Sequence, residues 1–473
     1  MFTNTQFCLP ASSLKSKELN LKNAKQRVNF FQDAFISGHE KKNEAIRHLN
    51  HLVSQLDSST DLSPLDWIDD VTQIEQYCYT HLQRTCTKFQ NYLARRKQQQ
   101  AREYFPTASH AFEFLTKVTP VKFVDGAWLY SVLEQADLQA HQDLILTYLE
   151  ELGLGDPMAN HVCMYQDLLR QHGLERFIEP LSPIYYEQAA VQLALAHVGV
   201  DDLAWVIGFN LAYEQLPLHL LISNYELQEL GIDPQYFNVH ITIDNLHNGH
   251  AKRSIDAFYQ GLSTAKDQAI YIKRVKQGYL LNDIGKSSTQ IIAELDLEQF
   301  VLQVFQDKAR VGQFIHNDKC QFAGKTINQW LSDPDQIQDF LNILIEKKWI
   351  IQNEAVENSR FWHMIDQPNG RMFGVFNATE KQIIKDWIQG ARLSTRLKPT
   401  HLEHSTAQTS KQLKTNEDEF ELGQLKKSIQ QSNDLKHQLS LLKPYLAPNL
   451  HATATGLWAT QHYTRLLFPA HRI

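Results

Sequence analysis

Apolar residues recur at intervals of three and four positions through most of the first hundred residues. The period is clear in "ELNLKNAKQRVNFFQDAF", "KKNEAIRHLNHLVSQL" and "WIDDVTQIEQYCYTHLQRTCTKFQNYLARRKQQQ", which contain few Gly or Pro residues. This spacing is typical of amphipathic helices that bury one face. The pattern predicts a helical N-terminal region over residues 1–105, which ends where Pro106 interrupts the period.

Longer and more apolar segments follow in residues 106–312. One of them, "DGAWLYSVLEQADLQAHQDLILTYLEEL", ends at "GLGDP", where Gly153 and Gly155 stop a helix and Asp156 and Pro157 suit the start of the next. The segments "SPIYYEQAAVQLALAHV" and "AWVIGFNLAYEQLPLHLLISNYELQEL" are too apolar for surface helices and are expected at the centre of a bundle. Because no sustained strand alternation is present, the predicted fold class is all-α.

The pattern changes again after residue 312. Short helical segments over residues 313–393, such as "IQDFLNILIEKKWIIQ", predict a small α domain, which is compatible with a winged-helix-like arrangement. Residues 394–420 are polar and poor in large apolar side chains, so they are expected to form a flexible linker. Residues 421–473 are expected to form one more amphipathic helix and a Pro-containing tail.

Composition narrows the class of protein. A chain of 473 residues with 43% apolar and 21% charged residues is expected to form a globular protein of two or three domains. It has no apolar run long enough to span a bilayer and no signal-like start, so we expect a cytoplasmic protein without a membrane partner. Its five scattered cysteines suit reduced thiols. A net charge of -7 gives no reason to expect nucleic acid as a partner.

One stretch, "NVHITIDNLHNGHA" at residues 238–251, has two interpretations. In steps of two, its alternating β-branched residues are typical of a half-buried strand. In steps of three and four, His240, Asp244 and His247 form one polar stripe on a helix. Two imidazoles and a carboxylate are donors that iron, zinc and manganese accept. The competing interpretation is a polar helix face without any ligand.

Partners for this stripe occur earlier in the chain. Glu214 lies among apolar residues in "LAYEQLPLHLL", where a cation would stabilise a buried carboxylate. Glu151 and His161 lie on either side of the Gly-Pro break, which could let both side chains face one centre. Each of these residues is unremarkable alone, and Glu150 competes with Glu151 for an ordinary surface position. Together three helical segments offer three carboxylates and three histidines.

These residues resemble a known ligand set. In order and spacing they are similar to the metal ligands of the haem-oxygenase-like diiron oxidases and oxygenases, in particular the iron-containing redox enzyme family. The strings "DGAWL", "ELGLGDPMANH", "GKTINQWLSDP" and "GRMFGVFNATE" are also similar to that family, and the resemblance covers about residues 110–393. Residues 1–105 and 394–473 match nothing that assigns them a role.

The resemblance implies that residues 106–312 form a haem-oxygenase-like bundle that binds two Fe(II) ions and no haem. The ligands implied in this way are Glu151, His161, Glu214, His240, Asp244 and His247. Which residue serves which iron stays open. Asp125 is the nearest candidate for a further carboxylate and is left out of the set. His250 lies at i+10 from His240 and is expected to point away, in an outer position or at the surface.

The implied activity is oxidation of a small organic substrate with dioxygen. The substrate and any catalytic side chain beyond the metal ligands are not indicated by these residues. An external electron donor and a homodimer are compatible with this hypothesis. Two alternatives remain: a metal-independent or thiaminase-like enzyme on the same fold, and a non-catalytic helical scaffold. Since Val239, Ile241, Thr242 and Ile243 favour helix poorly, we also expect residues 238–251 to be ordered by bound iron.

Overall fold

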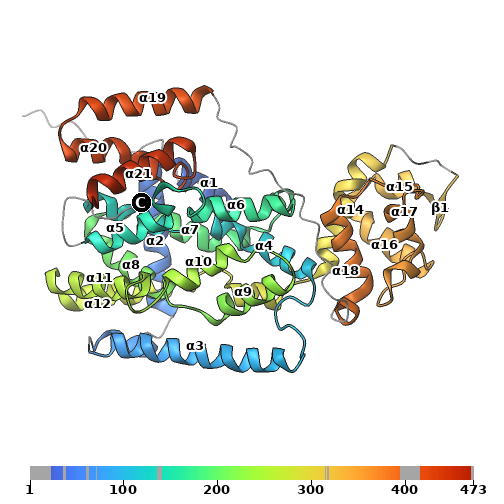
Figure 1. Ribbon diagram of the computed structural model, residues 1–473, viewed down its shortest axis with the longest axis horizontal. Coiled ribbons are helices and arrows are strands. Elements are labelled where there is room, and N and C mark those ends of the chain that lie inside the picture. The colour runs from blue at the N-terminus through green and yellow to red at the C-terminus, as the bar shows by residue number, and fades with distance from the viewer. Residues whose placement is uncertain are drawn as a thin grey trace, which may run out of the picture.

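The structure is a computed structural model that describes residues 23–35, 39–59, 63–70, 72–135, 141–314, 316, 319–394 and 416–469. The regular secondary structure of these residues is almost entirely helical (Figure 1). Their only strands are β1 (Gln321–Phe322) and β2 (Lys325–Thr326), which pair antiparallel. The predicted all-α fold class is confirmed. No helix of this described part is long and apolar enough to cross a membrane.

The N-terminal region consists of α1 (Ala24–Asp33), α2 (His39–Ser59) and α3 (Ile74–Lys97). Helices α1 and α2 pack against the central bundle, whereas α3 lies along α9 at one edge of the molecule (Figure 1). Buried apolar residues at helical spacing, such as Val28 and Phe31, form the inner face of α1. The predicted helical character of this region therefore rests on amphipathic faces that meet the bundle.

The central bundle contains nine α-helices among the described residues. They are α4 (Ala108–Lys122), α5 (Gln142–Glu151), α6 (His161–Gln171), α7 (Glu187–Leu195), α8 (Leu203–Tyr213), α9 (Leu218–Glu229), α10 (Gln235–Ile243), α11 (His250–Thr264) and α12 (Gln268–Leu281). Short 3-10 helices also occur among the described residues, within and outside the bundle: η1 (Ser63–Ile68), η2 (Ala127–Gln135), η4 (Gly153–Gly155), η5 (Glu175–Phe177), η6 (Pro183–Tyr186), η7 (Val200–Asp202), η8 (Pro334–Gln336), η9 (Val356–Asn358) and η10 (Lys443–Leu446).

Helix α8 occupies the centre of the bundle, where it is apolar on all sides. The backbones of α8 and α12 touch. A Cβ atom added at Gly208 would lie only 2.0 Å from the carbonyl oxygen of Val275. Likewise, a Cβ atom at Gly278 of α12 would lie 2.1 Å from the carbonyl oxygen of Trp205. Glycine is therefore required at both positions for this approach. The contact fixes the position of α8, whose C-terminal end carries Glu214.

Residues 288–394 gather at one end of the molecule (Figure 1). Their helices are α13 (Ser288–Ala293), α14 (Leu297–Gly312), α15 (Ile327–Leu331), α16 (Ile337–Glu346), α17 (Arg360–Asp366) and α18 (Ala378–Ser394). Helix α18 packs against both α14 and α4, and thereby joins this part to the bundle. The predicted limits of the small domain stay a prediction.

The C-terminal helices are α19 (Asn416–Gln431), α20 (Leu435–Leu442) and α21 (Ala454–Leu467). The single helix expected after residue 420 is wrong: it breaks at residues 432–434, where the Asp434 side chain caps α20 by accepting from the His437 amide. The expected tail contains α21 instead. Residues 395–415 of the predicted linker lie outside the described residues, and its last positions belong to α19.

Two hydrophobic cores hold these helices together. The first core combines buried residues of α1, α2, α5, α7, α8, α11 and α12 with those of α19–α21. The second core combines α4, α6, α9 and α10 with α14–α18. The N- and C-terminal helices thus share one core with half of the central bundle. Helices of both cores end or begin at buried polar residues.

Candidate metal centre

The candidate ligands lie where helices of the two cores end or begin. Glu151 is the last residue of α5, His161 the first of α6, and His250 the first of α11, while Glu214 and Asp244 follow the last residues of α8 and α10. All of them are buried. The possible metal-binding atoms form two groups, and within each group they all lie within 4.8 Å of one another. Glu151 belongs to both groups. The first group is Asp125, Glu151, His161 and His240, and the second group is Glu151, Glu214 and His250.

In the first group, two histidines face two carboxylates. His161 Nδ1 lies 2.6 Å from Glu151 Oε2 and 3.8 Å from Asp125 Oδ2, and His240 Nε2 lies 3.2 Å from Asp125 Oδ2. His240 Nδ1 donates to the Tyr236 carbonyl oxygen at 2.8 Å. Nε2 of the same ring lies within hydrogen-bond distance of Asp125 Oδ2, and it is the nitrogen of His240 that could bind a metal ion once free of a proton.

Asp125 is held in place by two tyrosines. Tyr213 donates its hydroxyl to Asp125 Oδ1 at 3.1 Å, and Tyr236 donates its hydroxyl to Oδ2. Burial alone would raise the pKa of Asp125, but Lys122 and His240 outweigh it and lower the pKa to about 2. Asp125 is therefore a carboxylate at neutral pH although it is completely enclosed.

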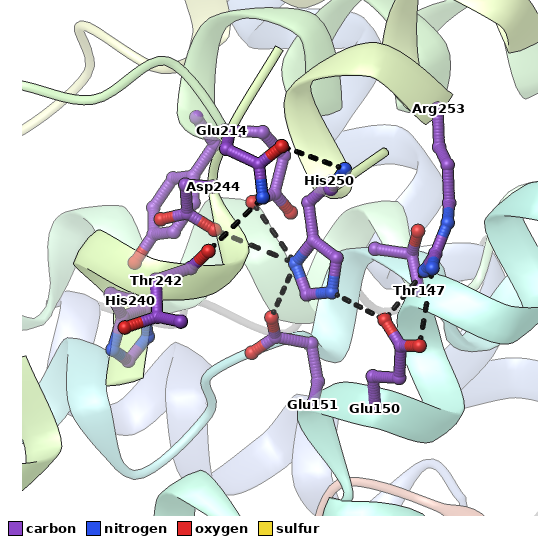
Figure 2. A network of polar contacts seen from close by, with 12 residues as sticks. Thr147, Glu150, Glu151, Glu214, His240, Thr242, Asp244, His250 and Arg253 are labelled. Atoms are coloured by element: carbon purple, nitrogen blue, oxygen red, sulfur yellow. Dashed lines mark hydrogen bonds and ion pairs between the residues drawn. The ribbon is translucent and has the colours of Figure 1, made fainter. Parts of the chain in front are cut away.

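In the second group, the His250 imidazole lies at the centre of three carboxylates (Figure 2). Its Nδ1 is 3.2 Å from Glu151 Oε1, 3.4 Å from Glu214 Oε2 and 3.5 Å from Asp244 Oδ1. Asp244 therefore belongs to the surroundings of this group as well.

The far side of the His250 ring is held from outside the group. Its Nε2 lies 3.0 Å from Glu150 Oε2, and Arg253 donates to both Glu150 oxygens at 2.5 and 3.2 Å (Figure 2). An imidazole anchored by a carboxylate on one nitrogen, with the other nitrogen facing a cluster of donors, is the usual arrangement of a metal-binding histidine.

The electrostatics of the second group show excess negative charge. Burial, followed by repulsion from Glu214, raises the pKa of Asp244 well above its ordinary value. Burial alone would lower the pKa of His250, but Glu214, Glu150 and Glu151 raise it well above its ordinary value. Both shifts mean that the Asp244 carboxyl and the His250 imidazole hold their protons tightly. A bound cation would take the place of those protons.

Several buried atoms of the two groups and of the neighbouring Asp244 have no hydrogen-bond partner. These atoms are Glu151 Oε2, His161 Nδ1, Glu214 Oε1, Asp244 Oδ1 and His250 Nδ1. Glu151 Oε2 and His161 Nδ1 form a close ion-pair contact with each other at 2.6 Å. A buried polar atom without a partner is costly, and so is a buried unpaired charge. Oxygen and nitrogen donors that converge in this way fit metal ions such as iron.

A comparison with protein families gives this site a context. Residues 112–281 match the family model described as iron-containing redox enzyme. Over these residues the chain is similar to that family. The resemblance inferred from the sequence is thereby confirmed, and the matched range includes every residue of both groups. Comparisons with curated proteins and with solved structures give no significant match.

The structure differs from the sequence expectation at His247. Helix α10 ends at Ile243, so the expected helical stripe of His240, Asp244 and His247 is not continuous. The Asn245 side chain accepts from the amides of His247, Asn248 and Gly249, and this turn replaces the helix. As a result His247 is exposed and lies outside both groups.

The structure brings in two residues that the expected set left out. His250 was expected to point away because its i+10 spacing assumes an unbroken helix, and the turn at Asn245 instead places it inside the second group. Asp125 belongs to the first group. The Asn248-Gly249 dipeptide was the available sequence signal for His250, because it marks a turn that ends the helical count.

A pocket of about 400 Å³ adjoins the centre. Glu150, His161 and Arg253 line it on the side of the metal-binding groups, and Leu154, Val239 and Ile243 supply apolar walls. This volume lies in the range of small-molecule sites, which commonly combine apolar walls with a few polar groups. A small organic molecule in this pocket would lie beside His161.

Proposed function

We propose that the protein is a non-haem diiron oxidase or oxygenase that uses dioxygen to oxidise a small organic substrate. Similarity to the iron-containing redox enzyme family supports an oxidoreductase. The observation that carries the finer proposal is the shared position of Glu151, whose two oxygens face two adjacent groups of donors. A carboxylate between two groups is suited to bridge two metal ions.

The residues divide between the two ions as follows. Asp125, Glu151, His161 and His240 would hold one iron, and Glu151, Glu214, Asp244 and His250 would hold the other. Four carboxylates carry the charge that offsets two ferrous ions, and the histidines supply the nitrogen donors that iron favours. Bound ferrous iron supplies the electrons and the open coordination positions that dioxygen requires.

The side chains around the centre keep these ligands in position. Tyr213 and Tyr236 hold Asp125 through their hydroxyl groups, and Glu150 holds the Nε2 proton of His250. For His250 to bind iron, its Nδ1 must be free of a proton, and Asp244 must be ionised. The pocket beside His161 would bind the substrate, with Leu154 and Val239 excluding water from it.

The two competing hypotheses, a helical scaffold and a metal-independent enzyme, do not require a cluster of buried carboxylates and histidines. A helical scaffold or a metal-independent enzyme has no use for five buried donor atoms without partners. An external electron donor, a homodimer and a cytoplasmic location stay predictions of this proposal.

The proposal is tested by the reaction of the iron-loaded protein with dioxygen. Protein loaded with Fe(II) without oxygen is mixed with oxygenated buffer, and absorbance and dioxygen consumption are followed together. We expect dioxygen to oxidise the iron bound to the wild-type protein in a single turnover. The rate of this oxidation should be much higher than in the Asp244→Ala protein, which should also bind less iron. Iron oxidation at the rate of free Fe(II), equal in both proteins, would contradict the proposal.

A further inference from the structure

The C-terminal cap, which we define as residues 443–467, lies outside the family-matched range and covers the turn between Glu151 and His161. Helix α21 of the cap packs directly on η4. A Cβ atom at Gly155 would lie 2.5 Å from the carbonyl oxygen of Leu457 and 2.6 Å from the amide nitrogen of Gln461. The backbones of the turn and of the cap therefore touch, and the turn cannot move outward while the cap is in place.

Hydrogen bonds join the cap to both helices that carry the ligands. Tyr148, near the end of α5, donates its hydroxyl to the Leu446 carbonyl oxygen at 2.5 Å. Cys163, in the first turn of α6, points its thiol at the Ala452 carbonyl oxygen at 3.8 Å. The cap thus contacts the chain three residues before Glu151 and two residues after His161.

The Asn160 side chain connects the turn to the cap. Both its oxygen and its nitrogen have identified hydrogen-bond partners. Its Oδ1 accepts from the Cys163 amide at 3.0 Å, which caps α6. Its Nδ2 donates to the Leu152 carbonyl oxygen at 3.2 Å and contacts His451 Nδ1 at 3.0 Å. Since Oδ1 is identified as the acceptor, Nδ2 must be the donor to both partners, and His451 Nδ1 accepts. Asn160 and His451 are both buried.

The neutral form of His451 suits this role. Burial, together with the neighbouring His161, lowers the pKa of His451 to about 4. The imidazole is therefore neutral at neutral pH, and Nδ1 has a free lone pair for the Asn160 amide.

The turn itself needs support. Gly153, Leu154 and Gly155 all have positive φ angles of 64°, 52° and 90°. For Leu154 this conformation costs about 1 to 2 kcal/mol, and such strain persists only where the surroundings impose it. The surroundings here are the cap and the Asn160 side chain. Without them the turn would relax, and Glu151 and His161 would change their relative position.

From these contacts we propose that His451 is a positioning residue, which acts through Asn160 to hold Glu151 and His161 in the geometry of the metal centre. The expected effect of His451 on metal binding rests on the proposed function, whereas its effect on the turn does not. The C-terminal cap would then be part of the enzyme's active structure, although residues 443–467 lie far from the matched range in sequence.

The test uses three variants of the full chain. His451→Leu removes the acceptor, and His451→Asn places an amide oxygen near the position of Nδ1. His462→Leu is the matched control, because His462 belongs to the same cap, lies on α21 and stacks on Trp458 instead. Two measurements are made: hydrogen exchange of residues 150–163 without metal, and titration with Co(II) followed by its visible absorption.

For His451→Leu we expect faster exchange over residues 150–163, a Co(II) affinity about 10-fold lower and an altered Co(II) spectrum, as for other outer partners of metal ligands. His451→Asn should restore exchange, affinity and spectrum, and His462→Leu should resemble the wild type. Unchanged exchange in His451→Leu, or equal losses in His451→Leu and His451→Asn, would overturn the inference.

Two further outcomes separate this inference from the proposed function. If the wild type binds no metal and His451→Leu still loosens residues 150–163, the positioning of the turn stands and the metal function falls. If His451→Leu does not fold, Asn160→Ser provides the test, since serine keeps the cap of α6 but is too short to reach His451. Unchanged exchange over residues 150–163 in that variant would overturn the inference.

Discussion

The protein buries carboxylates in two very different ways. Glu226 on α9 is completely buried, and it accepts from the Tyr92 hydroxyl at 2.8 Å and from the amides of Glu103, Tyr104 and Phe105 at 2.6, 3.0 and 2.7 Å. In the candidate metal centre, Glu151 and Glu214 are also buried, but each keeps an oxygen without a hydrogen-bond partner. Burial alone therefore does not distinguish the two sites.

The difference lies in what satisfies the charge. Around Glu226 the chain itself supplies four donors, and these bonds tie α3 and the following segment to α9. Around Glu151 the nearest groups are other carboxylates and histidines, whose potential metal-binding atoms face the same space. A carboxylate that the protein satisfies internally is structural, whereas converging donors without partners require a ligand from outside.

The largest expected effect comes from Glu151, because it belongs to both groups. Glu151→Gln should abolish stoichiometric binding of both Fe(II) ions in an anaerobic equilibrium titration. Glu150→Gln is the matched control one residue earlier. It disturbs the Nε2 side of His250 and the ion pair with Arg253, and it should weaken binding by about 10-fold, the lower end for outer partners. If the two variants bind iron equally, Glu151 does not bridge the groups.

A smaller effect is expected from a single ligand of the second group. His250→Ala should weaken binding of one Fe(II) ion by more than about 100-fold, which is the upper end for an outer partner, and leave the other ion in place. His247→Ala is the control, since His247 is exposed and outside both groups. Loss of one iron in His247→Ala with full loading of His250→Ala would reverse this assignment.

Glu226→Gln should affect stability and leave iron binding unchanged. The glutamine side chain lacks the negative charge that the four donors stabilise. Its own N–H groups would also face some of these donors, which have no lone pair to accept them. We expect the free energy of unfolding, measured by chemical denaturation, to fall by about 2 kcal/mol. Iron stoichiometry measured on the same preparation should equal that of the wild type. Reduced iron loading in this variant would remove the distinction between the two sites.

The smallest expected effect concerns a buried histidine away from the metal centre. Burial lowers the pKa of His197 to about 4, and its Nε2 donates to the Phe31 carbonyl oxygen at 3.1 Å. Since its folded pKa is below the unfolded value of about 6.5, only the unfolded chain gains this proton as the pH falls from 6.5 to 4. Stability is therefore lost in that window.

This pH effect has a direct check. As the pH falls from 7 to 5, the titration of His197 should lower the free energy of unfolding by about 1 to 2 kcal/mol. In His197→Gln, which keeps a donor for Phe31, denaturation at the two pH values should show a correspondingly smaller loss. His250 has the opposite sign, because its raised pKa adds stability at low pH that is lost as the pH rises. An equal loss in wild type and variant would contradict the assignment to His197.

The sequence was sufficient for the helices and for most of the converging residues. Apolar spacing predicted the all-α fold, and Glu151, His161, Glu214, His240 and Asp244 do approach one another in the structure. The choice between His247 and His250 depended on where α10 ends. That end is set by the hydrogen bonds of the Asn245 side chain, which compete locally with the helix.

Long-range packing was beyond the reach of periodicity. The residues of α21 show only that a helix could form there, whereas the contact between Gly155 and Leu457 depends on the fold of the whole chain. The same holds for the first core, which combines helices from both ends of the chain. Local patterns predict which face of a helix is buried and do not identify what covers it.

The central claim is that Glu151 joins two metal-binding groups, and the number of Fe(II) ions bound per chain tests it most directly. Protein is titrated with Fe(II) without oxygen, and bound iron is measured after removal of the excess. The account predicts two ions per wild-type chain. One ion per chain, or none, would contradict it.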